Sequence, residues 1–259
     1  MTREVFSLSR DGFVLEARLA PWDADAFGFP VAQITRIDVK ASERAEKEYG
    51  AFQSWVSAND VRIVSCRLSH ERLAASMFLE DRGFRFIEMV LHPQFEALQK
   101  RNLPDEALAV VPALDRDLPA LQAIAEQAFR HERYHMDPRL DPRLADKRYG
   151  RWVRASFNHP TQQLLKIVDG QQIIGVFVVE MDRGSRVHWH LTAIAPDFQG
   201  KGYGRRTWLS MLRYHRDKGA IMITTTISAR NVRVLNLYSR LSARFLPPEM
   251  TFHWVRPTE

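Results

Sequence analysis

Three glycines at every second position, Gly200, Gly202 and Gly204, form the stretch of this chain whose residue types most directly indicate chemistry. They follow an apolar, β-compatible run, 189–194, and precede a helix that the apolar spacing predicts over 207–218. A strand, a glycine loop and a helix in this order present free backbone N–H groups and the positive end of a helix to an anion. Glycine also allows close approach of the main chain and positive φ angles. The sequence therefore predicts an anion-binding loop; the simpler alternative is a plain turn between strand and helix.

Basic side chains flank this loop at Lys201, Arg205 and Arg206, and such charges suit phosphates. Neither the GxxxxGK[ST] pattern of nucleoside-triphosphate loops nor the GxGxxG pattern of dinucleotide-binding loops occurs here. The stretch reads instead as Q-x-x-G-x-G, from Gln199 to Gly204, after a strand that ends in Ala-Pro. This pattern resembles the pyrophosphate loop of the Gcn5-related N-acetyltransferases, the GNAT family, which hold acetyl-coenzyme A.

A second constellation follows the loop. A β-branched run over 220–227 predicts a strand, and Asn231 and Tyr238 stand at the start and near the end of a helix predicted over 232–241. Seven residues are about two helical turns, so the two side chains lie near one face. This arrangement resembles the last helix of the GNAT family, in which the Asn contacts the cofactor and the Tyr protonates the departing thiolate. The alternative for Tyr238 is an ordinary core aromatic.

The resemblance implies acetyl-CoA as co-substrate and requires no metal. In the family, the edge of the glycine-loop strand binds the pantetheine as an added strand and the loop amides hold the pyrophosphate. The cofactor-binding residues that this implies are Thr192, Ala193, Ile194, Gln199, Gly200, Lys201, Gly202, Tyr203, Gly204, Arg205 and Asn231.

The general base is open to several interpretations. In relatives with a carboxylate on the glycine-loop strand, that residue lies six positions before Ile194, where this chain has His188. His190 has the same parity, which predicts the same face of the strand, and a histidine is a competent base at neutral pH. Other relatives place a Glu five residues before the Asn, but Thr226 stands there and cannot serve. The alternatives are two purely structural histidines and a water that relays to a backbone carbonyl.

Residues 130–149 are the most polar aromatic-bearing stretch of the chain, and Pro138 and Pro142 exclude a continuous helix. A loop of this kind is where we expect acceptor recognition, although a solvated surface loop is the simpler interpretation. His131 and a second histidine four residues later do not indicate a metal, because prolines and a lack of further ligands surround them. The predicted acceptor-binding residues are Arg133, Tyr134, His135 and Asp137.

The chain has 259 residues, of which 45% are hydrophobic and 26% charged, as is ordinary for a soluble globular protein. No apolar run is long enough to span a bilayer, and residues 1–13 lack an apolar signal region. Its one cysteine, Cys66, excludes an internal disulfide and is expected to pack within a buried strand. These features predict a cytoplasmic protein without a membrane partner.

Charge is unevenly distributed along the chain. Residues 1–110 hold 14 Lys and Arg against 17 Asp and Glu, whereas residues 111–259 hold 23 against 14. The half with the glycine loop is therefore the basic one, which suits a small polyanionic ligand such as coenzyme A or a nucleotide sugar. No long basic run, interleaved aromatic array or zinc spacing supports nucleic-acid binding.

The predicted fold is α/β of the α+β type. We expect a GNAT acyl-CoA N-acyltransferase fold over 106–259, with a mixed, mostly antiparallel sheet and flanking helices. A smaller, degenerate, noncatalytic GNAT-like α/β domain is expected over 1–105, because its helix, Arg-Gly-Phe turn and strand resemble the end of such a unit but no glycine loop follows a strand. The alternative for the first domain is an unrelated α/β cap. The patterns predict strands over 12–19, 31–39, 61–68, 84–91, 163–168, 173–180 and 187–195, helices over 41–58, 71–81, 118–129 and 148–156, and a turn-rich aromatic stretch over 22–30.

The whole chain resembles the TDP-fucosamine acetyltransferase type of GNAT enzyme. The likeness rests on the two-domain length, the W-D-x-x-x-F-G segment from Trp22 to Gly28, the A-F-x-x-x-R-[YF] stretch from Ala128 to Tyr134, and the helix that carries Asn231 and Tyr238. It implies acetyl transfer to the amine of a nucleotide-linked deoxy-amino sugar and leaves a homodimer open. The alternatives are acetylation of a protein, peptide or small amine, and a noncatalytic acyl-CoA-binding sensor.

Overall fold

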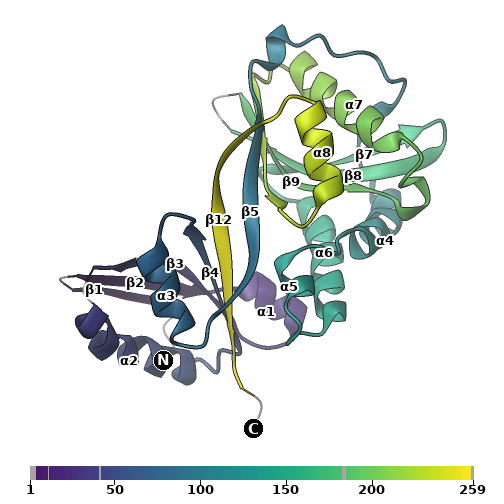
Figure 1. Ribbon diagram of the computed structural model, residues 1–259. Helices are drawn as coiled ribbons and strands as arrows, with labels where there is room; N and C mark the ends of the chain where they lie inside the picture. Colours follow the sequence, from purple (N-terminus) through teal and green to yellow (C-terminus); the bar gives the residue numbers. More distant parts are fainter. Residues whose placement is uncertain (1–3, 11, 41, 183–184, 258–259) are drawn as a thin grey trace. The chain divides into compact units, whose positions relative to one another are not determined.

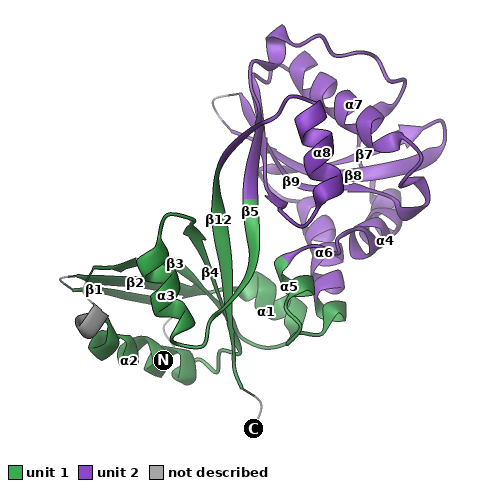
Figure 2. Ribbon diagram, viewed as in Figure 1, with its two compact units in different colours: residues 1–90, 133–144, 247–259 green, residues 91–132, 145–246 purple. Residues whose placement is uncertain are grey.

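The computed structural model describes residues 4–10, 12–40, 42–182 and 185–257 (Figure 1). The chain forms two compact units (Figure 2). Unit 1 comprises Met1–Val90, Arg133–Leu144 and Pro247–Glu259, and unit 2 comprises Leu91–Glu132 and Ala145–Leu246. None of the helices in the described ranges is long and apolar enough to cross a membrane.

Unit 1 is built mainly from the first part of the chain. Its elements are β1 (Val5–Arg10), β2 (Phe13–Leu19), α1 (Pro21–Phe27), β3 (Val31–Val39), α2 (Ser42–Ala58), β4 (Ile63–Ser69), α3 (Leu73–Glu80) and α5 (Arg133–Met136).

Unit 2 holds the glycine loop. Its elements are η1 (Leu98–Lys100), β6 (Ala109–Pro112), η2 (Asp115–Asp117), α4 (Leu118–Ala128), β7 (Gln162–Asp169), β8 (Gln172–Met181), β9 (Arg186–Ile194), η3 (Pro196–Phe198), α7 (Tyr203–Asp217), β10 (Met222–Thr225), β11 (Ile227–Ser228) and α8 (Val232–Arg240). The boundary between the units falls within β5 (Arg85–Phe95) and β12 (Arg244–Val255), and near the start of α6 (Pro142–Ser156).

The two units share one pattern of strand pairings, with one additional antiparallel strand in unit 2. In unit 1, β1, β2 and β3 are antiparallel, β3 and β4 are parallel, and β4 is antiparallel to β12. In unit 2, β6 to β9 are antiparallel, β9 and β10 are parallel, and β10 is antiparallel to β5. Each unit therefore completes its sheet with the strand that follows the last helix of the other half of the chain.

The parallel pairing of β9 with β10 in unit 2 stops before β9 ends. The last paired residues are Trp189 of β9 and Thr225 of β10, but β9 continues to Ile194. On its other side β9 stays paired with β8 as far as Ile194, which faces Gly175. Among the described residues, the segment of β9 after Trp189 thus has one edge without a partner strand. We call the place where β9 and β10 part the fork.

A β-bulge lies at the fork. Val178 of β8 pairs with Leu191 and Val179 pairs with Trp189, so His190 is an extra residue without an opposite partner. The bulge changes which face each side chain occupies. Trp189 and Ile194 belong to one buried cluster, whereas Leu191 belongs to another. The alternation of β9 therefore changes phase after His190, whereas the rings of His188 and His190 still lie together.

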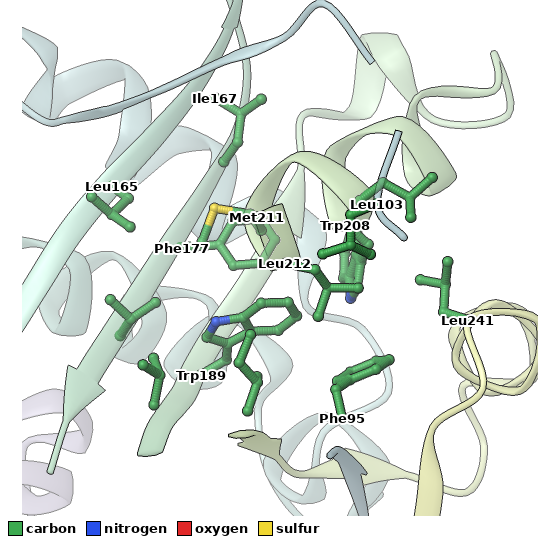
Figure 3. Close-up of a cluster of buried hydrophobic side chains, with 14 of the residues drawn as sticks. Phe95, Leu103, Leu165, Ile167, Phe177, Trp189, Trp208, Met211, Leu212 and Leu241 are labelled. Carbon is green, nitrogen blue, oxygen red and sulfur yellow. The ribbon is translucent and has the colours of Figure 1, made fainter. Parts of the chain in front are cut away.

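The larger core of unit 2 lies under α7 and α8. It contains Trp189, Trp208, Phe95, Phe177 and Tyr238, and Figure 3 shows the rings of the first four close together with Met211 and Leu212 of α7. A second cluster packs α4 and α6 on the other face of β8 and β9. Unit 1 has its own cluster, in which Cys66 is 1% exposed, as predicted for a buried strand residue.

Three local predictions are corrected by the structure. The stretch 22–30 is not a run of turns, because Pro21 opens α1 and Gly28 closes it in the left-handed conformation. Helix α6 begins at Pro142 rather than at 148, since proline is well tolerated in a first helical turn. The strand expected over 220–227 is interrupted at Thr226 and forms β10 and β11.

Candidate active site

Tyr238 lies at the fork of unit 2. Its side chain is 1% exposed and packs edge-on against Phe95, with ring centroids 5.6 Å apart. Burial raises the pKa of the Tyr238 hydroxyl, and contacts with Thr192 and Thr225 oppose that rise. The hydroxyl is therefore protonated at neutral pH and lies beside the last residue of β10 and the unpaired edge of β9.

The threonine of β10 also fixes the end of the parallel pairing. Thr225 Oγ1 donates to the carbonyl oxygen of Trp189 at 2.9 Å. The bond satisfies the last β9 carbonyl before the strands part. Beyond it, Thr192 to Ile194 keep an edge that faces away from β8, which is the edge an extended ligand would require.

The glycine loop follows β9 through the short helix η3. Gln199 Nε2 donates to the carbonyl oxygen of Ile194 at 3.0 Å, and this bond ties the loop to the end of the strand. Gly200 and Gly202 have φ angles of +76° and +84°, and Cβ atoms added there would meet nothing within 4 Å. Gly202 is the N-cap of α7, so the N–H groups of the first turn have no acceptor within the helix. The loop therefore combines an open surface with unpaired donors at a helix N-terminus.

The side chains around this loop have different partners. Arg205 pairs with Glu106 at 2.9 Å, and Arg206 donates to the main-chain oxygen of the same residue at 2.9 Å. Tyr203 donates its hydroxyl to Asp169 at 2.9 Å. Lys201 is exposed. Arg205 would have to leave or share Glu106 to contact a phosphate, whereas the loop amides need no such rearrangement.

Asn231 caps the helix that carries Tyr238. Its Oδ1 accepts from the backbone N–H of Val234 at 3.3 Å. The cap uses the amide oxygen, so a contact with a cofactor would involve the Nδ2 donor.

The two candidate bases lie together, as predicted, with ring centroids 4.6 Å apart. His188 Nδ1 hydrogen-bonds Thr224 Oγ1 at 2.9 Å, and burial lowers the pKa of His188 to about 4. His190 Nε2 lies 2.9 Å from Glu180 Oε2 on the neighbouring strand. Glu180 is absent from the sequence-based site because its proximity to His190 depends on the pairing of β8 with β9, which no local pattern encodes.

The predicted acceptor residues lie in unit 1 and are largely engaged there. Tyr134 is 1% exposed, and its hydroxyl donates to Asp23 Oδ2 at 2.8 Å. Arg133 lies 3.6 Å from the same carboxylate. These contacts join the Trp22–Gly28 and Ala128–Tyr134 motifs, which are distant in sequence.

The other two residues of that stretch follow the same pattern. Asp137 is buried, receives two short bonds from Arg139 at 2.7 and 2.8 Å, and accepts from His253 Nδ1 at 3.1 Å. His135 is partly buried. Arg133, Tyr134, His135 and Asp137 are thus brought together with Asp23 and His253, and their role in acceptor binding stays a prediction.

Comparisons with known proteins agree with this geometry. Residues 119–242 match a family model described as "Acetyltransferase (GNAT) family". The chain carries a GNAT-family acetyltransferase domain. The predicted family, fold class and enzyme class are confirmed, with the strand edge, glycine loop and Tyr238 helix all lying within or beside the matched residues.

Similar proteins extend the likeness over the rest of the chain. The chain is 19% identical to the spore coat polysaccharide biosynthesis protein SpsD of Bacillus subtilis (strain 168), over 92% of this chain and 82% of that protein. Its fold is similar to that of a GCN5-related N-acetyltransferase from Sphaerobacter thermophilus, with a TM-score of 0.66 at 13% identity, covering 99% and 82% of the two chains. A tandem GNAT protein from the clavulanic acid biosynthesis pathway aligns with a TM-score of 0.61 at 10% identity over 100% and 86%.

GNAT enzymes use acetyl-CoA, and the residues of unit 2 fit that co-substrate. The unpaired β9 edge from Thr192 to Ile194, the open loop amides and the helix N-terminus provide donors for an extended amide chain and for a diphosphate. Among the described residues, no group of three or more His, Cys, Asp or Glu side chains is placed to hold a metal.

Proposed function

We propose that this protein transfers the acetyl group of acetyl-CoA to the amino group of a nucleotide-linked deoxy-amino sugar. The observation that carries the proposal is the buried, protonated Tyr238 hydroxyl beside Thr192 and Thr225 at the fork. A proton donor at that place is suited to a leaving thiolate, because the thioester lies at the end of the chain that an added strand would place along β9.

Three observations favour a sugar nucleotide as the acceptor. The half of the chain that holds the site is basic, with 23 Lys and Arg against 14 Asp and Glu, which suits a phosphorylated substrate. The similar SpsD protein carries a name from polysaccharide biosynthesis, and the two proteins align over most of both chains. The Trp22–Gly28 and Ala128–Tyr134 motifs, which resemble those of sugar acetyltransferases, contact each other through Asp23 and Tyr134.

In the proposed reaction the substrate nitrogen loses two protons and the sulfur gains one. An ammonium loses a proton to a base, the amine nitrogen attacks the thioester carbonyl, and an N–C bond forms as the C–S bond breaks. Tyr238 donates its proton to the sulfur and regains one from solvent, while the new amide nitrogen sheds its surplus proton. The sum is an acetamide, free coenzyme A and one released proton.

The proposal extends to the organisation of the chain. We assign catalysis to residues 106–259 and a noncatalytic role to residues 1–105, because the helix position equivalent to Tyr238 holds Leu79 in the first part. A cytoplasmic location, where acetyl-CoA is available, and a small-molecule acceptor complete this assignment.

The test is thiol release from acetyl-CoA by the full chain. Nucleotide-linked 4-amino and 3-amino deoxysugars are tried as acceptors, and peptides and polyamines are tried separately as alternative acceptors. Turnover on the amino sugars alone is the expected result. Turnover on peptides or polyamines alone would contradict the proposed acceptor but would leave the assignment as an acetyltransferase intact. Cofactor binding without turnover on any amine would contradict the proposal and favour an acyl-CoA sensor.

A further inference from the structure

The bulge residue, His190, is the first residue of β9 beyond the strand's parallel pairing with β10. The last pair joins Trp189 to Thr225, and His190 follows directly. Because the bulge leaves His190 without a partner on β8, it re-aims this side chain independently of the regular pleat. His190 and Tyr238 therefore bracket the fork, since the Tyr238 hydroxyl contacts Thr225 on one strand and Thr192 on the other.

A carboxylate holds one nitrogen of this ring. Glu180 Oε2 lies 2.9 Å from His190 Nε2. Hydrogen bonds from Thr161 and His190 hold the pKa of Glu180 below its ordinary value, so the carboxylate is ionised at neutral pH. An ionised carboxylate accepts and does not donate, so neutral His190 carries its proton on Nε2 and presents a lone pair on Nδ1.

His188 is in a different situation. Its Nδ1 is engaged with Thr224 within the paired part of β9 and β10, and burial disfavours its charged form. A base must become charged when it accepts a proton. His188 hydrogen-bonds a threonine rather than a carboxylate, and the nearby charge of Glu180 only partly offsets the effect of burial on its pKa.

We propose that His190 is the general base, accepting the proton of the substrate ammonium at Nδ1, and that Glu180 is the positioning residue that holds the Nε2–H tautomer. This inference rests on the proposed function. The N–H bond of the ammonium breaks, an Nδ1–H bond forms, the charge moves from substrate to imidazolium beside Glu180, and the proton then leaves to solvent.

The ionisable groups near the pair, among the described residues, include His92 of β5, which lowers the pKa of His188. Around His190 and Glu180 are His188 on β9, His159 in the turn before β7, and Trp152 of α6, whose ring lies 6.0 Å from His190. Arg148 of α6 lies over the ring of that tryptophan, 5.3 Å from the ring centroid. Among these groups Glu180 is the carboxylate, so it is the group whose removal should change the tautomer of His190.

The test compares Glu180→Gln and Glu180→Asp with a control, Asp182→Asn, which removes a nearby exposed carboxylate that pairs with Arg186. We expect kcat/KM of Glu180→Gln to fall by about 10²-fold. The acid limb of its pH profile should move to lower pH, because the imidazolium loses its anionic partner. Glu180→Asp should recover part of the loss, and Asp182→Asn should match the wild type.

A readout independent of activity is the ¹⁵N NMR spectrum of the His190 ring, which should show the Nε2–H tautomer in the wild type and a mixture in Glu180→Gln. Acetyl-CoA affinity reports whether each variant is folded. An unchanged pH profile in a folded, active Glu180→Gln variant would overturn the inference and leave the proposed function intact. A wild type that acetylates no amine would instead remove the proposed function and this inference with it.

Discussion

The bulge that follows the last parallel pair holds Thr35 in unit 1 and His190 in unit 2. In unit 1, Glu16 pairs with Arg36 and Ala17 pairs with Ile34, so Thr35 is the extra residue, and Ile34 is also the last residue of β3 that pairs with β4. The backbone of the fork is thus repeated, but the side chain at its centre is a threonine whose hydroxyl bonds the carbonyl of Glu16.

The last helix of the first half, α3, and the last helix of the second half, α8, end with the same backbone hydrogen bond. The N–H of Phe84 donates to the carbonyl of Leu79 at 3.1 Å, and the N–H of Ala243 donates to that of Tyr238 at 3.0 Å, with 159 residues separating each equivalent pair. Leu79 is fully buried, as Tyr238 is. Unit 1 therefore keeps the packing of this helix position and lacks its hydroxyl.

The connection after the strand of the fork differs most. In unit 2, eight residues from Ala195 to Gly202 connect β9 to α7 and contain η3, Gly200 and Gly202, whereas in unit 1 β3 ends at Val39 and α2 begins at Ser42. The comparison teaches that the fork and bulge are properties of the fold, since both units have them. The catalytic assignment depends on a few side chains and one loop that unit 2 alone carries.

The largest expected effect comes from removing the hydroxyl that unit 1 lacks at the helix position. Tyr238→Phe keeps the ring contacts with Phe95 and Trp208 and removes only the hydroxyl. We expect kcat to fall by about 10²- to 10⁴-fold, as for loss of a general acid, while acetyl-CoA affinity is retained. Initial rates of thiol release and calorimetry measure the two quantities, with Tyr214→Phe on α7 as the matched control. An undiminished kcat would remove Tyr238 from the mechanism.

The next effect concerns stability, because His215 in unit 2 and His253 in unit 1 are almost completely buried. Burial lowers the pKa of His215 in unit 2 and of His253 in unit 1 to about 4. The unfolded chain binds these protons near pH 6.5, so the stabilisation is complete above that pH and is lost as the pH falls towards 4, with no further loss below it. Each histidine should account for on the order of 3 kcal/mol over this window.

Urea unfolding at several pH values measures this loss. His215→Phe should remove its share of the pH dependence, because both ring nitrogens of His215 are buried without a hydrogen-bond partner among the described residues. His253→Phe serves as the comparison in unit 1, where Asp137 is a partner of the ring. A wild-type free energy of unfolding that stays constant between pH 6.5 and 4 would contradict the assignment of buried neutral rings.

A smaller effect separates structure from acceptor binding in unit 1. Tyr134→Phe removes the donor to the buried Asp23 carboxylate and should lower the free energy of unfolding by about 1–3 kcal/mol. Tyr49→Phe, in the main hydrophobic cluster of the same unit, is the control. If Tyr134 also recognises the acceptor, the KM for the amine rises while the KM for acetyl-CoA stays unchanged. An unaltered KM for both would leave Tyr134 with a structural role alone.

Local patterns in the sequence predicted most elements of the fold. The apolar alternation of β3 and the glycine loop before α7 were sufficient because their signals are local. Helix α1 was missed although Pro21 and Gly28 are signals for its start and end, since the aromatic residues between them favoured an irregular stretch.

The missing parts of the site are properties of pairing rather than of local pattern. The bulge at His190 exists because β8 and β9 shift register, and Glu180 reaches His190 only through that pairing. The contact of Tyr134 with Asp23 joins residues 111 positions apart. Neither the exchange of β5 and β12 between the halves nor these contacts can be read from a single sequence, because each depends on which strand completes which sheet.

The smallest effect tests the loop that unit 1 lacks. Gly202 has a φ of +84°, and Gly219, just beyond the other end of α7, has a φ of +88°; a Cβ at either site meets nothing within 4 Å. Alanine at each position should therefore cost a similar 1–2 kcal/mol, roughly the strain of the left-handed conformation. Only Gly202→Ala should also weaken acetyl-CoA binding, because relief of the strain redirects the N–H groups at the start of α7.

Thermal melting and calorimetry of the two variants give a direct comparison. Equal losses of stability with equal cofactor affinity would mean that the loop serves only as a turn, and the difference between the units would then rest on the fork side chains alone.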